Sequence, residues 1–246
     1  MPLVLITGGS PQSIGSSIAL AFASQSPSLL ILASRTKSKL DEVLKSIQDA
    51  FPSITIKTVL LDLISQRSVR TAAEEVSKLT NRLDLIINNA GIMTQTRQTT
   101  AEGVEGQFGA NHIGHFLLTN LLMPWLLTAA SSNPAGATRV INLTSLGHRL
   151  SPVRFSDYNL QKPNEDIPED ERHAPLPPTL DKPVDGYKGF VAYGQAKSAN
   201  ILFSVGLNEK MGESGMRSYA VHPGCRWPSY HSRLKSSGKG EAGEIR

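Results

Sequence analysis

Two side chains of complementary chemistry, Tyr193 and Lys197, stand four residues apart in the segment "VAYGQAKSANILFSVGL". This spacing places both on one face of a helix, and the apolar residues around them predict that the helix is largely buried. A phenol, with a pKa of about 10, transfers protons poorly near neutrality, but a neighbouring ammonium favours its ionised form. The pair is therefore a candidate acid and base. The alternative is two solvent-facing residues, with Lys197 lying along a core edge.

The elements that hold this pair follow from alternating short apolar runs and longer helical patterns. Near-continuous runs rich in Val, Ile and Leu predict strands covered on both faces. These patterns predict a doubly wound α/β Rossmann fold, a six-stranded parallel sheet with helices on both faces. The predicted strands are Leu3–Thr7, Leu29–Ser34, Ile54–Leu63, Leu83–Asn88, Arg139–Ser145 and Ser218–His222, and the predicted helices are Ile14–Ser24, Ser38–Ala50, Ser65–Thr80, Val104–Ala129 and Ala192–Met211.

The composition bounds the class of protein. The chain has 246 residues, of which 39% are hydrophobic, enough for one α/β domain with a sizeable core. With 25 basic and 21 acidic residues it carries no dense basic block, so no nucleic-acid partner is expected. The single cysteine, Cys225, excludes an internal disulfide. The N-terminus lacks the pattern of a signal peptide, and the longest apolar run, 116–130, is too short and polar for a membrane span. We expect a cytoplasmic protein.

Two segments interrupt the alternation. Residues 146–190 form a proline-rich insertion, with seven prolines and the acidic run "NEDIPEDER" in 151–190. Long insertions of this kind are typically disordered or act as lids, and we expect the acidic run to be solvated. Residues 225–246 are poor in apolar side chains and predict a loose tail. The expected organisation is one cofactor-binding domain over 1–224, including the insertion, followed by that tail.

The first strand is followed by a glycine-containing turn and then a helix. Gly8 and Gly9 permit a tight turn, and Gly15 permits close packing of the helix on the sheet. At this position of a doubly wound sheet, backbone N–H groups and the helix dipole favour a pyrophosphate. An ordinary strand–helix turn is the alternative. We favour the dinucleotide site because the turn belongs to the first such unit of the sheet.

The second strand ends in Ser34 and Arg35, with Lys37 close behind. A carboxylate at this point binds a ribose 2′-hydroxyl, whereas cations and a hydroxyl suit a 2′-phosphate. The predicted cofactor is therefore NADP(H), although a solvated loop is the alternative. Asp62 and Leu63, at the end of the third strand, are expected to flank the adenine. The segment after the fourth strand is expected to approach the ribose through Asn89, Ala90 and Gly91.

Together these motifs resemble those of the short-chain dehydrogenase/reductase family. The matching motifs, in family order, are T-G (Thr7 and Gly8), the strand-three Asp62, N-N-A-G (Asn88–Gly91) and Y-x-x-x-K (Tyr193 and Lys197). The segments "GVEGQFGANHIGHFLLTNLLMPWLL", "RVINLTSLGHR" and "AYGQAKSANILF" look most like the branch of the retinol dehydrogenases and the WW-domain oxidoreductases. The resemblance runs from about Leu3 to Gly224.

The resemblance implies a role for each catalytic residue. Tyr193 would protonate a carbonyl oxygen during reduction, or act as base in the reverse direction. Lys197 would favour the phenolate and bind the nicotinamide ribose. Ser145 would donate a hydrogen bond to the substrate oxygen. Asn111 would hold a water that connects Lys197 to solvent.

The turn and the C-terminus depart from the family pattern. The family turn reads T-G-x-x-x-G-x-G, whereas Thr7 to Gly15 is one residue longer here and Ser13 replaces the middle glycine. We still expect Ser13, Ile14 and Gly15 to bind the cofactor. Pro223 and Gly224 would border the nicotinamide. The family continues with a threonine and a seventh strand, but Cys225 and the residues after it match neither.

The sequence therefore predicts an NADP(H)-dependent oxidoreductase that interconverts a carbonyl and an alcohol on a small, fairly apolar substrate such as a lipid or a secondary metabolite. A catalytically impaired protein that binds NADP(H) or a partner is the alternative, because the C-terminus is altered. The family resemblance also implies a homodimer. His112 and His115 lie three apart, but no further ligand has a convincing spacing, so we expect both at a polar helix edge and no metal site.

Overall fold

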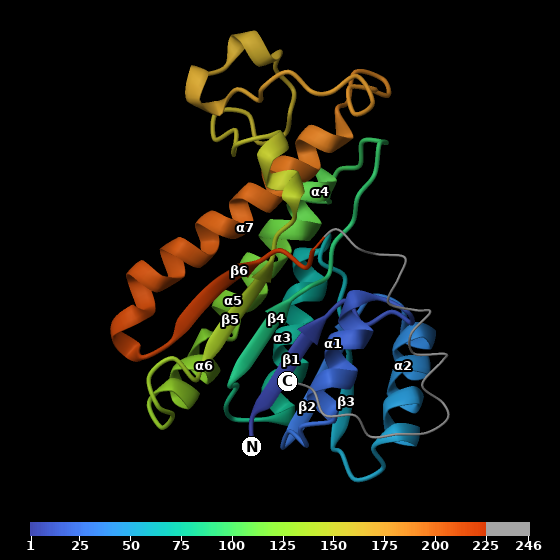
Figure 1. The fold of residues 1–246 in the computed structure, drawn as a ribbon, viewed down its shortest axis with the longest axis vertical. Coiled ribbons are helices and arrows are strands. Elements are labelled where there is room, and N and C mark those ends of the chain that lie inside the picture. The colour runs from blue at the N-terminus through green and yellow to red at the C-terminus, as the bar shows by residue number, and fades with distance from the viewer. Residues whose placement is uncertain (225–246) are drawn as a thin grey trace.

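The computed structural model describes residues 1–224, which fold around one six-stranded parallel sheet (Figure 1). The strand order is β3-β2-β1-β4-β5-β6, which confirms the predicted doubly wound fold. The strands are β1 Leu3–Thr7, β2 Leu29–Ser34, β3 Ile56–Leu60, β4 Leu85–Asn88, β5 Arg139–Leu143 and β6 Arg217–Val221. The α-helices are α1 Ile14–Ala23, α2 Lys37–Ala50, α3 Gln66–Leu79, α4 Gly106–Phe108, α5 Gly114–Leu121, α6 Met123–Ala130 and α7 Gly189–Met211. The predictions of a loose tail and of no seventh strand fall on 225–246, outside the described residues.

Alternate residues of the central strands bury their side chains in two cores. Val4 and Ile6 of β1 join the core formed with α1 and α2, while Leu5 joins the core formed with α3, α5, α6 and α7. All three side chains are completely buried. Covering on both faces explains why these strands read as continuous apolar runs rather than alternating ones.

The sheet reverses its winding at β1, which pairs with β2 on one side and β4 on the other. In such sheets a crevice opens beyond the carboxyl ends of the strands at the point of reversal. The residues that follow β1, β2, β3, β4 and β5 meet at that edge. This edge is where the sequence places the cofactor and the catalytic side chains.

The predicted single helix over Val104–Ala129 is wrong. The chain instead forms α4, a π-helical turn η1 at Gly109–Ile113, then α5 and α6. The break lies at Leu122, and Pro124 follows in the first turn of α6, where its missing N–H is tolerated. Within 1–224 no single helix has the length and apolar composition to cross a membrane, and only the pair Gly106–Leu121 and Met123–Ala130 passes such a test jointly, bent by 57°.

The proline-rich insertion forms a lobe at the end of α7 where this helix begins (Figure 1). Its regular structure is limited to 3₁₀ turns at η2 Leu146–Leu150, η3 Asn164–Asp166 and η4 Glu169–Glu171; a fourth, η5 Gly212–Ser214, follows α7. Most acidic side chains of the 164–172 run are exposed, as predicted. The lobe is nevertheless ordered around a buried ion pair, in which Arg154 Nη2 lies 2.7 Å from Asp157 Oδ2 and each side chain is 3% exposed.

Element boundaries differ from the predictions by a few residues. The third strand is shorter than predicted because turn hydrogen bonds take the backbone at both ends. Ile54 N–H bonds the Phe51 carbonyl oxygen, and Asp62 N–H bonds the Ser68 hydroxyl. The fifth strand ends at Leu143, two residues early, because Ser145 starts the turn η2 and caps it with its side chain.

Candidate active site

The turn after β1 can be built only with glycine at two positions. Gly8 has a φ of +84°, and a Cβ there would lie 2.7 Å from the Ala90 Cα atom. A Cβ on Gly15 would collide with the Gly8 carbonyl oxygen. Both positions therefore bring backbone into close contact, which is what a turn that packs against a pyrophosphate requires.

Ser13 caps helix α1 rather than presenting a free hydroxyl. Its Oγ accepts a hydrogen bond from the Ser16 N–H at 3.2 Å and donates to the Ser10 carbonyl at 2.6 Å. The Ser16 hydroxyl lies 3.0 Å from the Ser13 N–H and accepts its hydrogen bond, which completes a capping box. The cap begins α1 at Ile14, so the positive end of this helix faces the turn.

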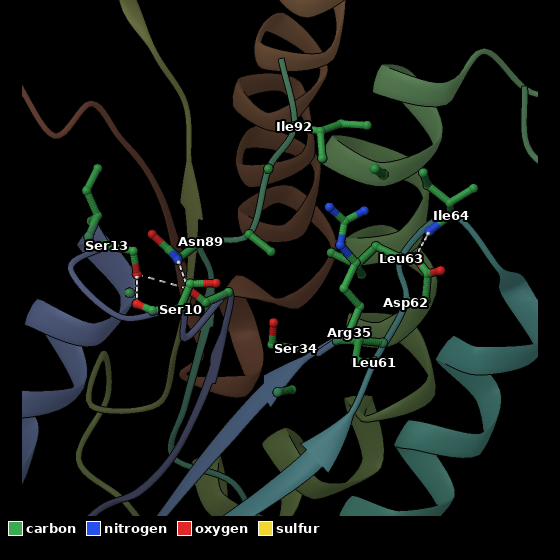
Figure 2. A pocket seen from close by; sticks show the side chains of 17 residues that line it. Ser10, Ser13, Ser34, Arg35, Leu61, Asp62, Leu63, Ile64, Asn89 and Ile92 are labelled. Atoms are coloured by element: carbon green, nitrogen blue, oxygen red, sulfur yellow. Dashed lines mark hydrogen bonds between the residues drawn. The ribbon is translucent and has the colours of Figure 1, made fainter. Parts of the chain in front are cut away.

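The turn opens into a cavity of about 320 Å³ that runs along the ends of β1, β2, β3 and β4. Figure 2 shows the Arg35 side chain extending from the end of β2 into the space between Asn89 and Asp62. Arg35 is exposed and forms no hydrogen bond or ion pair within residues 1–224. Predicted cofactor residues that line the cavity are Gly8, Ser13, Ile14, Gly15, Ser34, Arg35, Asp62, Leu63, Asn89, Ala90 and Gly91.

Lys37 is the exception among the predicted cofactor residues. It lies in the first turn of α2 outside the cavity, and its Nζ is 2.8 Å from Asp41 Oδ2 on the exposed face of that helix. The structure thus brings Arg35, but not Lys37, to the cavity. Arg35, which is unpaired within residues 1–224, the Ser34 hydroxyl and the glycine turn at the opposite end form a set of donors that fits a phosphorylated dinucleotide.

The segment after β4 is held against the end of β1 by hydrogen bonds. The Thr7 hydroxyl accepts from the N–H groups of Asn89 (3.0 Å) and Ala90 (3.1 Å). The Asn89 side chain returns a hydrogen bond to the Thr7 carbonyl at 2.8 Å. These bonds fix the small residues Ala90 and Gly91 at the cavity wall.

A second cavity, of about 220 Å³, continues from the first and shares Ile14, Asn89, Gly91 and Ile92 with it. Its remaining wall contains the predicted catalytic and nicotinamide-bordering residues Ser145, Tyr193, Lys197, Pro223 and Gly224. The two cavities form one cleft in which a dinucleotide can extend from the glycine turn to the catalytic side chains.

Lys197 is almost completely buried at the base of this second cavity, with 3% of its surface exposed. Its Nζ donates a hydrogen bond to the Leu143 carbonyl at 3.0 Å and lies 5.5 Å from the centre of the Tyr193 ring. Burial lowers the pKa of Lys197 from 10.5 to about 8. The ammonium is thus held at a fixed point beside the phenol ring.

Ser145 and Tyr193 are brought together across Gly147. A Cβ on Gly147 would lie 2.9 Å from two carbons of the Tyr193 ring and 3.5 Å from Ser145 Oγ. Ser145 Oγ also accepts a hydrogen bond from the Gly147 N–H at 3.2 Å. The absence of a side chain at 147 therefore lets the serine hydroxyl and the tyrosine face the same space.

Asn111 is fully buried in the π-helical turn, and its side chain is occupied by Ile92. Its Oδ1 accepts from the Ile92 N–H at 2.7 Å, and its Nδ2 donates to the Ile92 carbonyl at 2.9 Å. A Cβ on Gly91 would lie 3.3 Å from Asn111 Oδ1 and 3.6 Å from Lys197 Nζ. Asn111 and Lys197 thus flank Gly91.

Sequence reasoning missed the role of His115. This residue is 1% exposed rather than at a polar helix edge, and its Nε2 lies 2.8 Å from the Thr7 hydroxyl. His112 instead bonds Asn200, at 3.2 Å.

Within residues 1–224 no three His, Cys, Asp or Glu side chains gather as a metal site would require. Gly147 was also missed, although its place two residues after Ser145 was a usable signal.

Comparison with known proteins gives the same assignment at the level of family. Residues 2–162 match the family model for short chain dehydrogenases. Oxidoreductase fscI of Fusarium equiseti is 33% identical over 225 residues, which cover 91% of this chain and 86% of that protein. Human retinol dehydrogenase 13 is 35% identical over 221 residues, covering 90% of this chain and 58% of the relative. The chain therefore spans less than two thirds of that retinol dehydrogenase.

Solved structures agree on the fold. A crystal structure of an uncharacterised protein from Mycobacterium paratuberculosis has a TM-score of 0.68 at 26% identity, over 99% of this chain and 78% of the other. The NADP complex of Pseudomonas aeruginosa RhlG has a TM-score of 0.65 at 22% identity, over 96% of this chain and 76% of the other. On the family model and the relatives above, the chain belongs to the short-chain dehydrogenase family of oxidoreductases, in its retinol-dehydrogenase-like branch.

Proposed function

We propose that the protein is an NADP(H)-dependent oxidoreductase that interconverts a carbonyl and an alcohol. One observation carries the proposal. Ser145, Tyr193 and Lys197 line a single cavity, and this cavity shares its walls with the cleft that starts at the glycine turn. Ser145 caps the turn that follows β5, and Tyr193 and Lys197 belong to α7, so the fold itself brings them together beside the place for a nicotinamide.

The preference for NADP(H) over NAD(H) rests on the end of β2. Arg35 reaches the cavity without a partner in 1–224, and Ser34 beside it supplies a hydroxyl. A guanidinium pairs well with a phosphate, whereas an NAD enzyme places a carboxylate at this point to bind two ribose hydroxyls. The charge of Arg35 thus favours the 2′-phosphate.

When bound, the cofactor supplies or accepts a hydride at its nicotinamide ring. In the direction of reduction, the Tyr193 hydroxyl gives its proton to the carbonyl oxygen. The Ser145 hydroxyl donates a hydrogen bond to the same oxygen and so stabilises its developing charge. The positive charge of Lys197, fixed by Leu143, stabilises the phenolate that remains on Tyr193. Gly91 keeps the wall beside Lys197 free of side chains.

The substrate is proposed to be fairly apolar and bulky. Ile92 and Met93 line the catalytic cavity, and Met93 is 51% exposed. Leu146, next to Ser145, is 45% exposed. Large apolar side chains that stay accessible at the mouth of a site gain from contact with an apolar ligand. The name of the relative retinol dehydrogenase 13, an enzyme of an apolar alcohol, supports the same class. A cytoplasmic location and a homodimer stay predictions.

The experiment is NADPH oxidation by the full chain over a panel of apolar ketones and aldehydes, with Tyr193→Phe as the matched variant. The phenylalanine keeps the ring and removes only the hydroxyl. We expect turnover that Tyr193→Phe abolishes, with nucleotide affinity retained by both proteins. Nucleotide binding without turnover of any carbonyl would instead favour the catalytically impaired binding protein. Failure to bind either nucleotide would overturn both.

A further inference from the structure

His115 of α5 joins the end of β1 to the π-helical turn, a connection that no other side-chain hydrogen bond makes within residues 1–224. Its Nε2 lies 2.8 Å from the Thr7 hydroxyl, at the end of β1, and its Nδ1 lies 3.2 Å from the Asn111 carbonyl oxygen, in the π-helical turn. The ring is 1% exposed. A buried imidazole with both nitrogens engaged is held in one orientation.

The two contacts fix the tautomer. A carbonyl oxygen can only accept a hydrogen bond, so the nitrogen facing Asn111 must carry the proton. Neutral imidazole has one N–H, and Nε2 must therefore accept. The Thr7 hydroxyl is the donor to Nε2, because the alternative acceptor, the Ile87 carbonyl, lies farther away at 3.4 Å.

Once it donates to His115, the Thr7 hydroxyl has a fixed orientation. Its oxygen already accepts the N–H groups of Asn89 and Ala90. The hydrogen bonds then run in one direction, from the two amides through Thr7 and His115 to the Asn111 carbonyl. Chains with donors aligned in this way polarise and strengthen one another.

The His115 imidazole stays neutral at neutral and mildly acidic pH. Burial lowers the pKa of His115 from 6.5 to about 3, although its bond to Asn111 acts in the opposite direction, and the nearby charge of Lys197 lowers it further. His112 itself is held neutral, since burial lowers its pKa to about 4. Lys197 is therefore the charged group that acts on this ring.

From this geometry we infer that His115 is a positioning residue, which orients the Asn111 backbone carbonyl and ties it to the cofactor-binding segment through Thr7. The inference rests on the proposed function for its catalytic consequence. Two hydrogen bonds to the Ile92 backbone fix the Asn111 side chain, and we assign its backbone carbonyl to hold a water next to Lys197. His115 takes one lone pair of that oxygen and leaves the other for the water.

Three substitutions separate the two contacts. His115→Asn places an amide N–H near the position of Nδ1 and keeps the bond to Asn111 while losing Thr7. His115→Gln places its amide oxygen near Nε2 and keeps the bond from Thr7 while losing Asn111. His115→Phe retains a ring and loses both. Leu118→Ala, on the same helix and buried in the core, controls for loss of stability alone.

Two measurements do not need turnover. Nitrogen-15 NMR of the histidines should show that the ring signal lost in His115→Phe belongs to a neutral imidazole, protonated at Nδ1 and unchanged between pH 5 and 8. NADPH affinity, measured by calorimetry, should fall roughly tenfold in His115→Asn and stay near wild type in His115→Gln, because only the latter keeps Thr7 in place. If the signal lost in His115→Phe came from a ring protonated at Nε2, or if His115→Asn and His115→Gln bound NADPH equally, the inference would be overturned.

The third measurement is turnover with its solvent deuterium isotope effect. We expect kcat to fall roughly tenfold, with a larger isotope effect, in His115→Gln and His115→Phe. His115→Asn and Leu118→Ala should keep the wild-type isotope effect. An equal loss of kcat in all four variants would show that His115 has a merely structural role and would refute the proposal that it positions the Asn111 carbonyl. If the wild-type protein turned over no carbonyl, the proposed function would fail, while the tautomer and the affinities would still decide the hydrogen-bond path.

Discussion

The Lys197 ammonium lies 5.5 Å from the centre of the Tyr193 ring and is anchored from the other side by the Leu143 carbonyl, 3.0 Å away. The anchor comes from the last residue of β5, two residues before Ser145. The sheet thus sets the position of the lysine, and α7 sets the position of the tyrosine relative to it. Changes to either side of this contact give measurable consequences.

The buried lysine makes stability rise with alkaline pH. Burial lowers the pKa of Lys197 to about 8 in the folded protein, against 10.5 when exposed. Between these values the unfolded chain binds more protons, so the free energy of unfolding increases as the pH rises from 8 to 10.5. Urea titrations at pH 7.5 and 10 should show that the wild type gains more, relative to Lys197→Met, at the higher pH. An equal difference at both pH values would contradict this.

Gly147→Ala should impair catalysis without weakening the binding of the nucleotide. The new Cβ would meet the Tyr193 ring at 2.9 Å, and the ring must move away from Ser145. We expect kcat for carbonyl reduction to fall by at least an order of magnitude, with NADPH affinity unchanged.

Gly206→Ala is the matched control for this substitution. Gly206 lies in α7, and a Cβ there meets nothing within 4 Å. It should raise the free energy of unfolding by up to about 1 kcal/mol and leave kcat intact. Equal kcat values in the two alanine variants would contradict the role assigned to Gly147.

Arg35→Gln should change the choice of nucleotide. The loss of a charge-assisted bond to the 2′-phosphate is expected to weaken NADPH binding roughly ten- to a hundredfold, with little effect on NADH. Lys37→Gln should have a much smaller effect, because Lys37 pairs with Asp41 outside the cavity. Fluorescence titration of both nucleotides measures this. Tighter binding of NADH than NADPH by the wild type would refute the assignment of the cofactor.

The lobe depends on the buried pair of Arg154 and Asp157. Arg154→Met leaves a buried carboxylate without its cation, and the expected loss of stability is about 3–5 kcal/mol. Replacing both residues, as Arg154→Met with Asp157→Leu, should recover part of that loss. The exposed pair of Lys45 and Asp49 is the control, since Lys45→Met should cost no more than about 1 kcal/mol. Chemical denaturation compares the four proteins.

The sequence was sufficient to predict those parts of the site that depend on residues close together in the chain. Tyr193 and Lys197 share a helix face by spacing alone, and the glycine turn follows β1 directly. The strands, the doubly wound fold and the position of the cleft then followed from apolar runs and their alternation with helices.

What could not be predicted depends on contacts between distant residues. Tyr187 is buried because its hydroxyl donates to Glu105 at 2.7 Å, across 82 positions of sequence. His115 is buried because α5 packs it against the end of β1, whereas its helical neighbours suggested a polar edge. Neither the contact of Tyr187 with Glu105 nor that of His115 with the end of β1 can be predicted from residues nearby in the sequence. The break at Leu122 was different, because Pro124 was visible in the sequence and should have ended the predicted helix.

The lobe supplies none of the cleft's walls. Every residue lining the two cavities lies outside 150–186, yet α7 starts at its edge, where a side chain at Gly189 would collide with the Thr94 carbonyl oxygen. Exchange of that segment for one from a relative would leave the walls of the nucleotide site intact. The architecture thus separates the redox machinery from a segment that can vary without contacting it.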